Sequence, residues 1–141
     1  MSEKPLPVRV VDAMMAKDYF SQWLGIERLE DGEGISVIRM TVRNEMLNGF
    51  GIAHGGITYS LADSAFAFAS NSHGRHAVSI ETSISHTQAV FEGDVLTASA
   101  KLDKLSNRVA WYRVEITNQN QDLVAIFKGT VYRKSQEWEN D

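Results

Sequence analysis

Apolar and polar residues alternate along much of the second half of the chain, which is the pattern of a strand with one covered face. The alternation is clearest over residues 78–85 and 95–105. Turn-forming residues at 106–107 and 118–122 separate the segments that follow. With an earlier alternating segment included, the pattern predicts five strands, at residues 35–43, 78–85, 95–105, 109–117 and 123–133.

Two other segments have their apolar residues at the spacing of a helix. The first is a short amphipathic N-terminal helix over residues 10–24, followed by Gly25 as a suitable end. Its apolar positions are Val10, Ala13, Met14, Phe20 and Leu24. The second helix begins at Gly55-Gly56 and runs to about Ser70. It is apolar or small almost all round, so other elements should enclose it.

The predicted order is helix, strand, long central helix and then at least three long antiparallel strands. One sheet packed on one enclosed helix is an α+β layer architecture. No repeat, linker or low-complexity tract divides residues 1–141, so a single domain is expected. The tail at 134–141 is mostly polar and is expected to fray.

Composition narrows the class of protein. Apolar residues make up 43% and charged residues 23% of the 141 residues, as in soluble globular domains. The net charge of -4 gives no reason to expect nucleic acid or a membrane surface as a partner. No apolar run reaches the ~20 residues of a membrane span, and no signal peptide is evident. The absence of cysteine excludes disulfides, thiolate zinc sites and a cysteine nucleophile. A cytoplasmic location is expected by default.

Asp63 is an acid inside the helix that should be enclosed. Its neighbours along the helix are almost all apolar, and no Lys or Arg lies within one helical turn. An ionised carboxylate in such a place loses hydration unless it is paired or hydrogen-bonded. Either Asp63 is a general base or nucleophile, or it is satisfied structurally by Ser60, Tyr59 or a neighbouring strand.

Gly55 and Gly56 stand where this helix starts. One interpretation is that glycine lets a ligand oxygen approach the first-turn N–H groups, which are unpaired and form the positive end of the helix dipole. Such N–H groups polarise a carbonyl and hold an oxyanion. The other interpretation is a tight loop that needs a positive φ or close packing.

His54 and Asn48 have similar pairs of interpretations. His54 either orients a substrate carbonyl or caps the turn before the helix. Asn48 either hydrogen-bonds a catalytic water or substrate, or forms the Asn-Gly turn. Donors, a carboxylate and a glycine turn coincide within residues 48–63, and this coincidence favours a site there.

Other motifs in the sequence give weaker evidence for a functional site. His73 and His76 are three positions apart in a predicted loop without a nearby acid, which favours an exposed loop over a metal site. No metal site is expected elsewhere. The chain has no Walker-type phosphate loop, no Gly-x-Gly-x-x-Gly after a strand and no Gly-x-Ser-x-Gly elbow.

The run His54-Gly-Gly-Ile-Thr-Tyr-Ser-Leu-Ala-Asp63, preceded by Met46-Leu-Asn-Gly49, closely resembles the PaaI-like hotdog-fold acyl-CoA thioesterases. The likeness extends from the N-terminal helix to Arg133 and is greatest to the phenylacetic acid degradation branch of that family. It includes residues 66–72, 92–94 and 114–119. The resemblance implies a hotdog fold, in which a long antiparallel sheet wraps around the central helix. It also implies a homodimer or homotetramer with one continuous sheet per dimer and the active site at the dimer interface.

The resemblance also assigns roles. Asp63 would be the catalytic carboxylate, acting on water as general base or on substrate as nucleophile, and would face Gly55 across the interface. The Gly55 N–H would polarise the thioester carbonyl, with Asn48 and His54 beside the water and substrate. The implied substrate contacts are Gly56, Ser79, Tyr59 and Phe66.

The implied reaction is hydrolysis of an acyl-CoA thioester to the free acid and CoA, with arylacetyl groups favoured, such as phenylacetyl or ring-hydroxylated forms. It needs no cofactor, because CoA is part of the substrate. The alternatives are a hotdog acyl-CoA dehydratase or hydratase, whose Asp-x-Asn-Pro-x-x-His pattern is absent here, and a non-catalytic acyl-CoA binding protein, which has no need of Asp63.

One segment departs from the family. Many relatives have an Arg-Pro pair where this chain has Thr-Gln-Ala-Val-Phe at 87–91, so the residues that hold the CoA phosphates are open. Lys101, Lys104 and Arg108 are candidate substitutes or simply solvated charges.

Overall fold

The computed structural model describes residues 3–139. Its helices are α1 (Leu6–Met15), α2 (Tyr19–Leu24), the short 3-10 helix η1 (Asn44–Met46) and α3 (Gly55–Asn71). Its strands are β1 (Glu27–Gly32), β2 (Ile35–Thr41), β3 (Arg75–His86), β4 (Val95–Leu105), β5 (Val109–Thr117) and β6 (Leu123–Glu137). Among these residues no helix has both the length and the apolar character required to cross a membrane.

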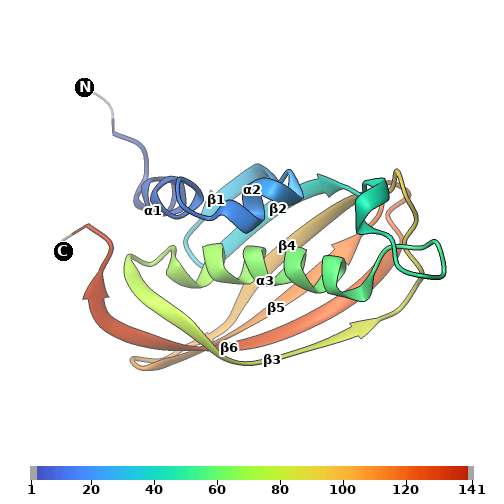
Figure 1. Cartoon of the computed structure of the whole chain (residues 1–141). Coiled ribbons are helices and arrows are strands. Elements are labelled where there is room, and N and C mark those ends of the chain that lie inside the picture. The colour runs from blue at the N-terminus through green and yellow to red at the C-terminus, as the bar shows by residue number, and fades with distance from the viewer. Residues whose placement is uncertain (1–2, 140–141) are drawn as a thin grey trace.

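The six strands form one sheet in the order β1-β2-β4-β5-β6-β3, and every neighbouring pair is antiparallel. The sheet curves around α3, which lies along its concave side, while α1 and α2 cover the other side of α3 (Figure 1). The α+β hotdog architecture predicted from the sequence is therefore confirmed. One consequence for the site is that β3 is an edge strand, with one of its two long sides unpaired in a single chain.

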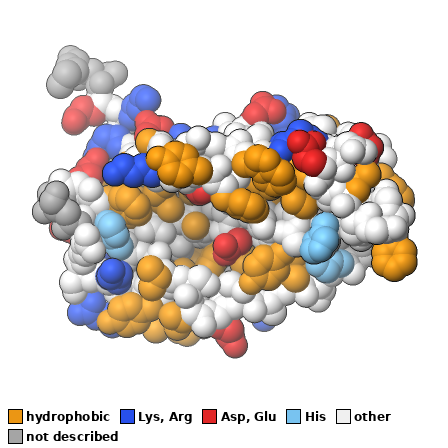
Figure 2. Space-filling model, viewed as in Figure 1, with side chains coloured by type: hydrophobic (Ala, Val, Ile, Leu, Met, Phe, Trp, Pro, Cys, Tyr) orange, Lys and Arg blue, Asp and Glu red, His pale blue; other side chains and the backbone are white. Residues whose placement is uncertain are grey.

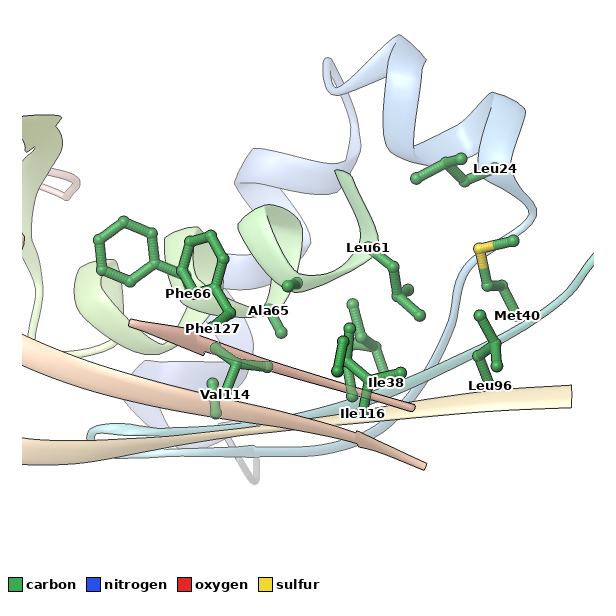
Figure 3. Close-up of a cluster of buried hydrophobic side chains, with 14 of the residues drawn as sticks. Leu24, Ile38, Met40, Leu61, Ala65, Phe66, Leu96, Val114, Ile116 and Phe127 are labelled. Atoms are coloured by element: carbon green, nitrogen blue, oxygen red, sulfur yellow. The ribbon is translucent and has the colours of Figure 1, made fainter. Parts of the chain in front are cut away.

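The core lies between α3 and the sheet. Leu61, Ala65 and Phe66 point from α3 toward the strands (Figure 3), and each is at most 1% exposed. A Cβ atom on Gly129 of β6 would lie 2.6 Å from Phe66 Cζ, so only glycine leaves room for that ring. The ring of Phe66 also packs against the rings of Tyr112 and Phe127. These contacts fix the rotation of α3, and with it the direction of Asp63.

The N-terminal segment forms two helices, so the prediction of one helix over 10–24 is wrong. Asp18 interrupts the run, because its side chain accepts the Ser21 N–H and caps a new helix there. Gly25 ends α2 with a φ of 77°, in the left-handed region. Phe20, counted as an apolar-face residue, is 52% exposed. The break turns the aromatic residues of α2 outward.

Two strand predictions also need correction. β1 was not predicted, because its sequence Glu-Arg-Leu-Glu-Asp-Gly is mostly polar and lies at the sheet edge, where no alternation is required. β6 continues to Glu137, so the expected fraying from Lys134 is wrong for the described part of the tail. Trp138 holds its end, since its Nε1–H donates to Asn71 Oδ1 and its N–H to Gly74 O, both at 2.9 Å. Residues 140–141 lie outside the described residues.

Candidate active site

Asp63 lies half-buried on α3 and has no partner for its charge. Within residues 3–139 its carboxylate makes no hydrogen bond or ion pair. The interpretation that Ser60 or Tyr59 satisfies it is wrong, because the Ser60 hydroxyl donates to Gly56 O at 2.7 Å and the Tyr59 hydroxyl bonds Thr82 Oγ1. Burial raises the pKa of Asp63, and the negative charge of Asp18 raises it further.

Asp18 is connected through the hydroxyl of Ser21 to the hydroxyl of Ser64, the residue that follows Asp63. Asp18 Oδ2 accepts the Ser21 hydroxyl at 2.6 Å, and Ser21 Oγ lies 2.8 Å from Ser64 Oγ in a buried contact. This chain of bonds fixes the start of α2 against α3. It places a second carboxylate close enough to Asp63 to oppose its ionisation.

Gly55 is the first residue of α3, and its N–H donates to no acceptor in the described chain. A Cβ atom at this position would lie 3.3 Å from His86 Nε2, so glycine allows the end of β3 to approach the helix start. Gly55 lines a cavity of about 420 Å³ together with Asn48, Thr58 and His86. An oxygen atom in this cavity can accept the free N–H at the positive end of the helix dipole.

His54 caps α3, as one of its two interpretations predicts. Its Nδ1 accepts the Gly56 N–H at 2.8 Å, while the ring itself is exposed. The Gly56 N–H is therefore already engaged. His54 and Gly56 line a second groove of about 370 Å³, on the side of α3 that faces α2. The structure thus divides the predicted site between two hollows at the helix start.

Asn48 forms the predicted turn, with its Oδ1 accepting the Phe50 N–H at 2.9 Å. Its backbone N–H donates to Ile52 O at 2.7 Å, which closes the loop that leads to α3. The side-chain NH₂ has no acceptor within residues 3–139, and Asn48 lines the same cavity as Gly55. The turn role therefore leaves the amide donors available to a ligand.

The expected substrate contacts lie in different surroundings. Phe66 is 1% exposed, so its expected place in a pocket wall is wrong for the single chain, where it is a core residue. Tyr59 is half-buried and packs edge-on against Phe127, with ring centroids 5.6 Å apart. Ser79 is exposed on β3, opposite Val131 of β6.

Asp63 and Gly55 are far apart within one chain. Eight positions separate them in α3, which is about 12 Å along the axis at 1.5 Å per residue. A thioester carbonyl that accepts the Gly55 N–H therefore cannot also lie next to the Asp63 carboxylate of the same chain. The two groups can act on one carbonyl only if they come from two copies of the chain.

Sequence reasoning missed three side chains near the helix start. His86 reaches Gly55 only because β3 returns along α3, a contact that local sequence does not reveal. Phe20 and Trp23 line the groove beside His54, with ring centroids 5.9 Å apart. In the sequence these two residues lie within the segment predicted as one amphipathic helix, which gave no reason to place them beside His54. Figure 2, in the same orientation as Figure 1, shows hydrophobic side chains on both sides of α3 and most charged side chains toward the edge of the molecule.

His73 and His76 are both partly buried, so the expectation of an exposed loop is wrong, and so is the expectation of no nearby acid, because Glu33 Oε1 lies 3.5 Å from His73 Nδ1. The side chain of His73 is 6% exposed, and its Nε2 lies 2.8 Å from the Tyr112 hydroxyl. Burial lowers the pKa of His73. His76 lies on β3 and stacks on Trp138, with ring centroids 4.1 Å apart. Both imidazoles are part of the structure at the C-terminal end of α3.

The candidate phosphate-binding cations lie away from Gly55 within one chain. Lys104 and Arg108 belong to the β4–β5 hairpin, whose Asn107 is hydrogen-bonded by Arg75 just after the C-terminal end of α3. Arg108 donates to Ser135 Oγ at 2.9 Å. Lys101 lines a hollow with Ile35 of β2 and Arg113 of β5. None of the three lines the Gly55 cavity.

Comparison with known proteins places this geometry in a family. Residues 50–125, which include Gly55, Asp63 and His86, match the thioesterase superfamily. The chain is 42% identical over 121 residues to the acyl-coenzyme A thioesterase PaaI of Escherichia coli, covering 86% of each protein.

Comparison with solved structures gives the same family. The E. coli PaaI structure superposes with a TM-score of 0.91 and 39% identity, covering 93% of this chain and 95% of that one. A thioesterase protein from Streptococcus pneumoniae, solved with coenzyme A, superposes with a TM-score of 0.77 and 28% identity, covering 79% and 90%. The chain therefore belongs to the thioesterase superfamily and, within it, to the PaaI-like acyl-CoA thioesterases of the hotdog fold.

Proposed function

We propose that two copies of this chain form a site that hydrolyses arylacetyl-CoA, such as phenylacetyl-CoA or a ring-hydroxylated form, to the free acid and CoA. The observation that carries the proposal is the pair of unpartnered groups on α3, the Asp63 carboxylate and the Gly55 N–H, in a PaaI-like chain. One is a base and the other an oxyanion donor. No cofactor is needed in this proposal, since CoA is part of the substrate.

The chemistry follows from the two groups. Asp63 takes a proton from a water molecule as the water oxygen bonds to the thioester carbonyl carbon. The carbonyl oxygen gains negative charge, which the Gly55 N–H of the other copy stabilises by donating a hydrogen bond to it. The C–S bond then breaks and CoA leaves as a thiolate, which needs little help because free thiols have a pKa of about 8.5. The proton on Asp63 passes to the thiolate or to water, which restores the carboxylate. Direct attack by Asp63, through an anhydride, uses the same two groups.

The edge strand β3 supports pairing of two copies. It is 12 residues long, and its outer side is unpaired in the single chain. Val78 and Ile80 on this strand are 48% and 58% exposed. A long edge strand with exposed apolar side chains is a template for pairing with another strand. Antiparallel pairing of β3 with its symmetry mate would give the continuous sheet of a homodimer, which could pair again as a homotetramer.

The arylacetyl group is supported by the similarity to E. coli PaaI, a protein of the phenylacetic acid degradation operon. A panel of phenylacetyl-, hydroxyphenylacetyl-, benzoyl- and straight-chain acyl-CoA, followed by release of free thiol, tests this choice. Higher kcat/KM for the arylacetyl thioesters is expected. A preference for straight chains would contradict the acyl group but not thioester hydrolysis.

Asp63→Asn tests the mechanism. We expect kcat to fall by about 10²–10⁴-fold, because a general base contributes that much. The same thiol assay measures the loss, and light scattering checks that the oligomer is kept. Asp103→Asn, which removes an exposed acid of β4, serves as the matched control and should keep full activity. Undiminished turnover by Asp63→Asn would refute the assignment.

A further inference from the structure

His86 lies beside Gly55, the residue at the start of α3 whose N–H has no acceptor within residues 3–139. Of the atoms around Gly55, the nearest to a Cβ position there are His86 Nε2 at 3.3 Å and His86 Cε1 at 3.6 Å. The imidazole therefore presents its Nε2 edge to the helix start. Nε2 is the ring atom that can donate a hydrogen bond in one neutral tautomer.

The backbone holds this imidazole in place. His86 is the last residue of β3 and pairs with Ala125 of β6. The next residue is fixed twice, because the Thr87 N–H donates to Val124 O at 2.9 Å and its hydroxyl donates to Leu123 O at 2.7 Å. Within residues 3–139 the His86 ring itself has no hydrogen-bond or ion-pair partner. The backbone of His86 is therefore fixed, while its ring is exposed and available to a ligand.

The cavity beside His86 suits a developing negative charge. Asn48, Gly55 and Thr58 line it with polar groups, and His86 is the only titratable side chain among its described lining residues. No carboxylate from residues 3–139 lines the cavity to repel an oxyanion. Gly55 and His86 line this cavity together, so an oxygen bound beside Gly55 has His86 as its neighbouring titratable side chain.

We propose that His86 is a further catalytic residue, which donates its Nε2–H to the thioester carbonyl oxygen beside the Gly55 N–H. This inference rests on the proposed thioester hydrolysis. As the water oxygen bonds to the carbonyl carbon, the C=O π electrons move to the oxygen, and both donors strengthen their bonds to it. When the C–S bond breaks, the electrons return and the imidazole keeps its proton throughout. His86 thus stabilises charge and transfers no proton.

The variants His86→Ala and His86→Gln test the role. Loss of one oxyanion donor costs about 10²–10³-fold in kcat, with KM changed far less. We expect that loss in His86→Ala and partial recovery in His86→Gln, whose side-chain amide is also a donor. The acid limb of the pH profile should stay in place, because it belongs to Asp63. Glu92→Gln, an exposed change in the loop before β4, is the control.

A second measurement observes the hydrogen bond directly. In the Asp63→Asn background, a ketone analogue of phenylacetyl-CoA with CH₂ in place of sulfur is bound, and its carbonyl stretch is recorded by infrared spectroscopy. The stretch should move to higher frequency when His86 is replaced by Ala, because one donor is lost. An unmoved band, or His86→Ala within twofold of the wild-type kcat, would overturn the role of His86 alone. Absence of thiol release by the wild type from every thioester would overturn the proposed function and this inference together.

Discussion

At the scale of the residue, Asp63 is notable for what surrounds it. Its carboxylate has no partner in residues 3–139, and its pKa is shifted first by burial and then by the charge of another acid, Asp18. Both burial and repulsion favour the protonated form, so the pKa of Asp63 is raised. A base with a raised pKa binds protons more strongly and works closer to neutral pH than an ordinary aspartate would. Burial of a carboxylate without a partner lowers the stability of the fold, while the raised pKa makes Asp63 a stronger base in the proposed reaction.

Asp18→Asn should therefore move the pH profile of the enzyme. The active form of Asp63 is the carboxylate, so activity is lost as pH falls through its raised pKa. Removal of the Asp18 charge lowers that pKa, and the acid limb of kcat should shift to lower pH. Asn remains a good helix N-cap, so α2 should persist. A kcat profile with an arylacetyl-CoA measures the shift; an acid limb that stays in place would show that Asp18 does not act on Asp63.

His73 gives a second pH effect, on stability. Burial lowers its folded pKa below the ordinary value of about 6.5. As pH falls below that value, the unfolded chain binds a proton at this position that the folded chain does not, so the free energy of unfolding decreases. Urea titrations between pH 7 and 5 should show this decrease. His73→Gln, which cannot gain the charge, should have a smaller decrease, and an equal slope would contradict the prediction.

At the scale of the element, the chain end and the central helix are joined. Trp138 donates to Asn71 and Gly74, at the end of α3, and stacks on His76 of β3. The last residues of β6 therefore close the structure at the end of α3 that is opposite to Gly55.

Trp138→Ala should cost about 1–3 kcal/mol of unfolding free energy, less than a fully buried Trp because the residue is half-buried. Urea denaturation measures the loss. Lys134→Ala, an exposed change on the same strand, is the control and should stay within about 0.5 kcal/mol of the wild type. Equal midpoints for the two variants would show that the tail is not held by Trp138.

The elements that sequence predicted best are those with two different faces. β4 and β5 begin and end where predicted, because each has one face on the core and one in solvent. β1 has no such contrast, and a single polar residue, Asp18, ended the first helix early by capping the next. The site divides in the same way. Asn48, His54 and Gly55 lie in one short segment, so the sequence could propose them together as candidates, whereas His86 is brought to Gly55 by the sheet alone.

At the scale of the whole molecule, the separation of Gly55 from Asp63 along α3 makes the proposed active site a property of the pair. Asp63→Asn and Gly55→Pro should each be inactive. Pro suits the first position of a helix but lacks the N–H, and its Cβ would lie 3.3 Å from His86 Nε2, so it also displaces that ring. Co-refolding equal amounts should restore about a quarter of the wild-type activity, because half of the dimers are mixed and each has one intact site of two.

The mixture is compared with each variant refolded alone, by thiol release at equal protein concentration. The oligomeric state is checked in parallel by size-exclusion chromatography with light scattering, where a dimer or larger assembly is expected. A mixture no more active than its components, or a fully active monomer, would contradict a site shared between two chains.

The contact between Phe66 and Gly129 has a consequence for how such a chain can evolve. The ring lies where any side chain at Gly129 would have to be, so residue 129 cannot become larger while Phe66 is kept. A larger residue at 129 would demand a smaller one at 66, and that exchange would rotate or shift the helix that carries Asp63. A larger residue at 129 should therefore occur only together with a smaller residue at 66. Because Asp63 lies on the same helix as Phe66, a paired exchange at 66 and 129 would alter the packing that sets the position of the carboxylate.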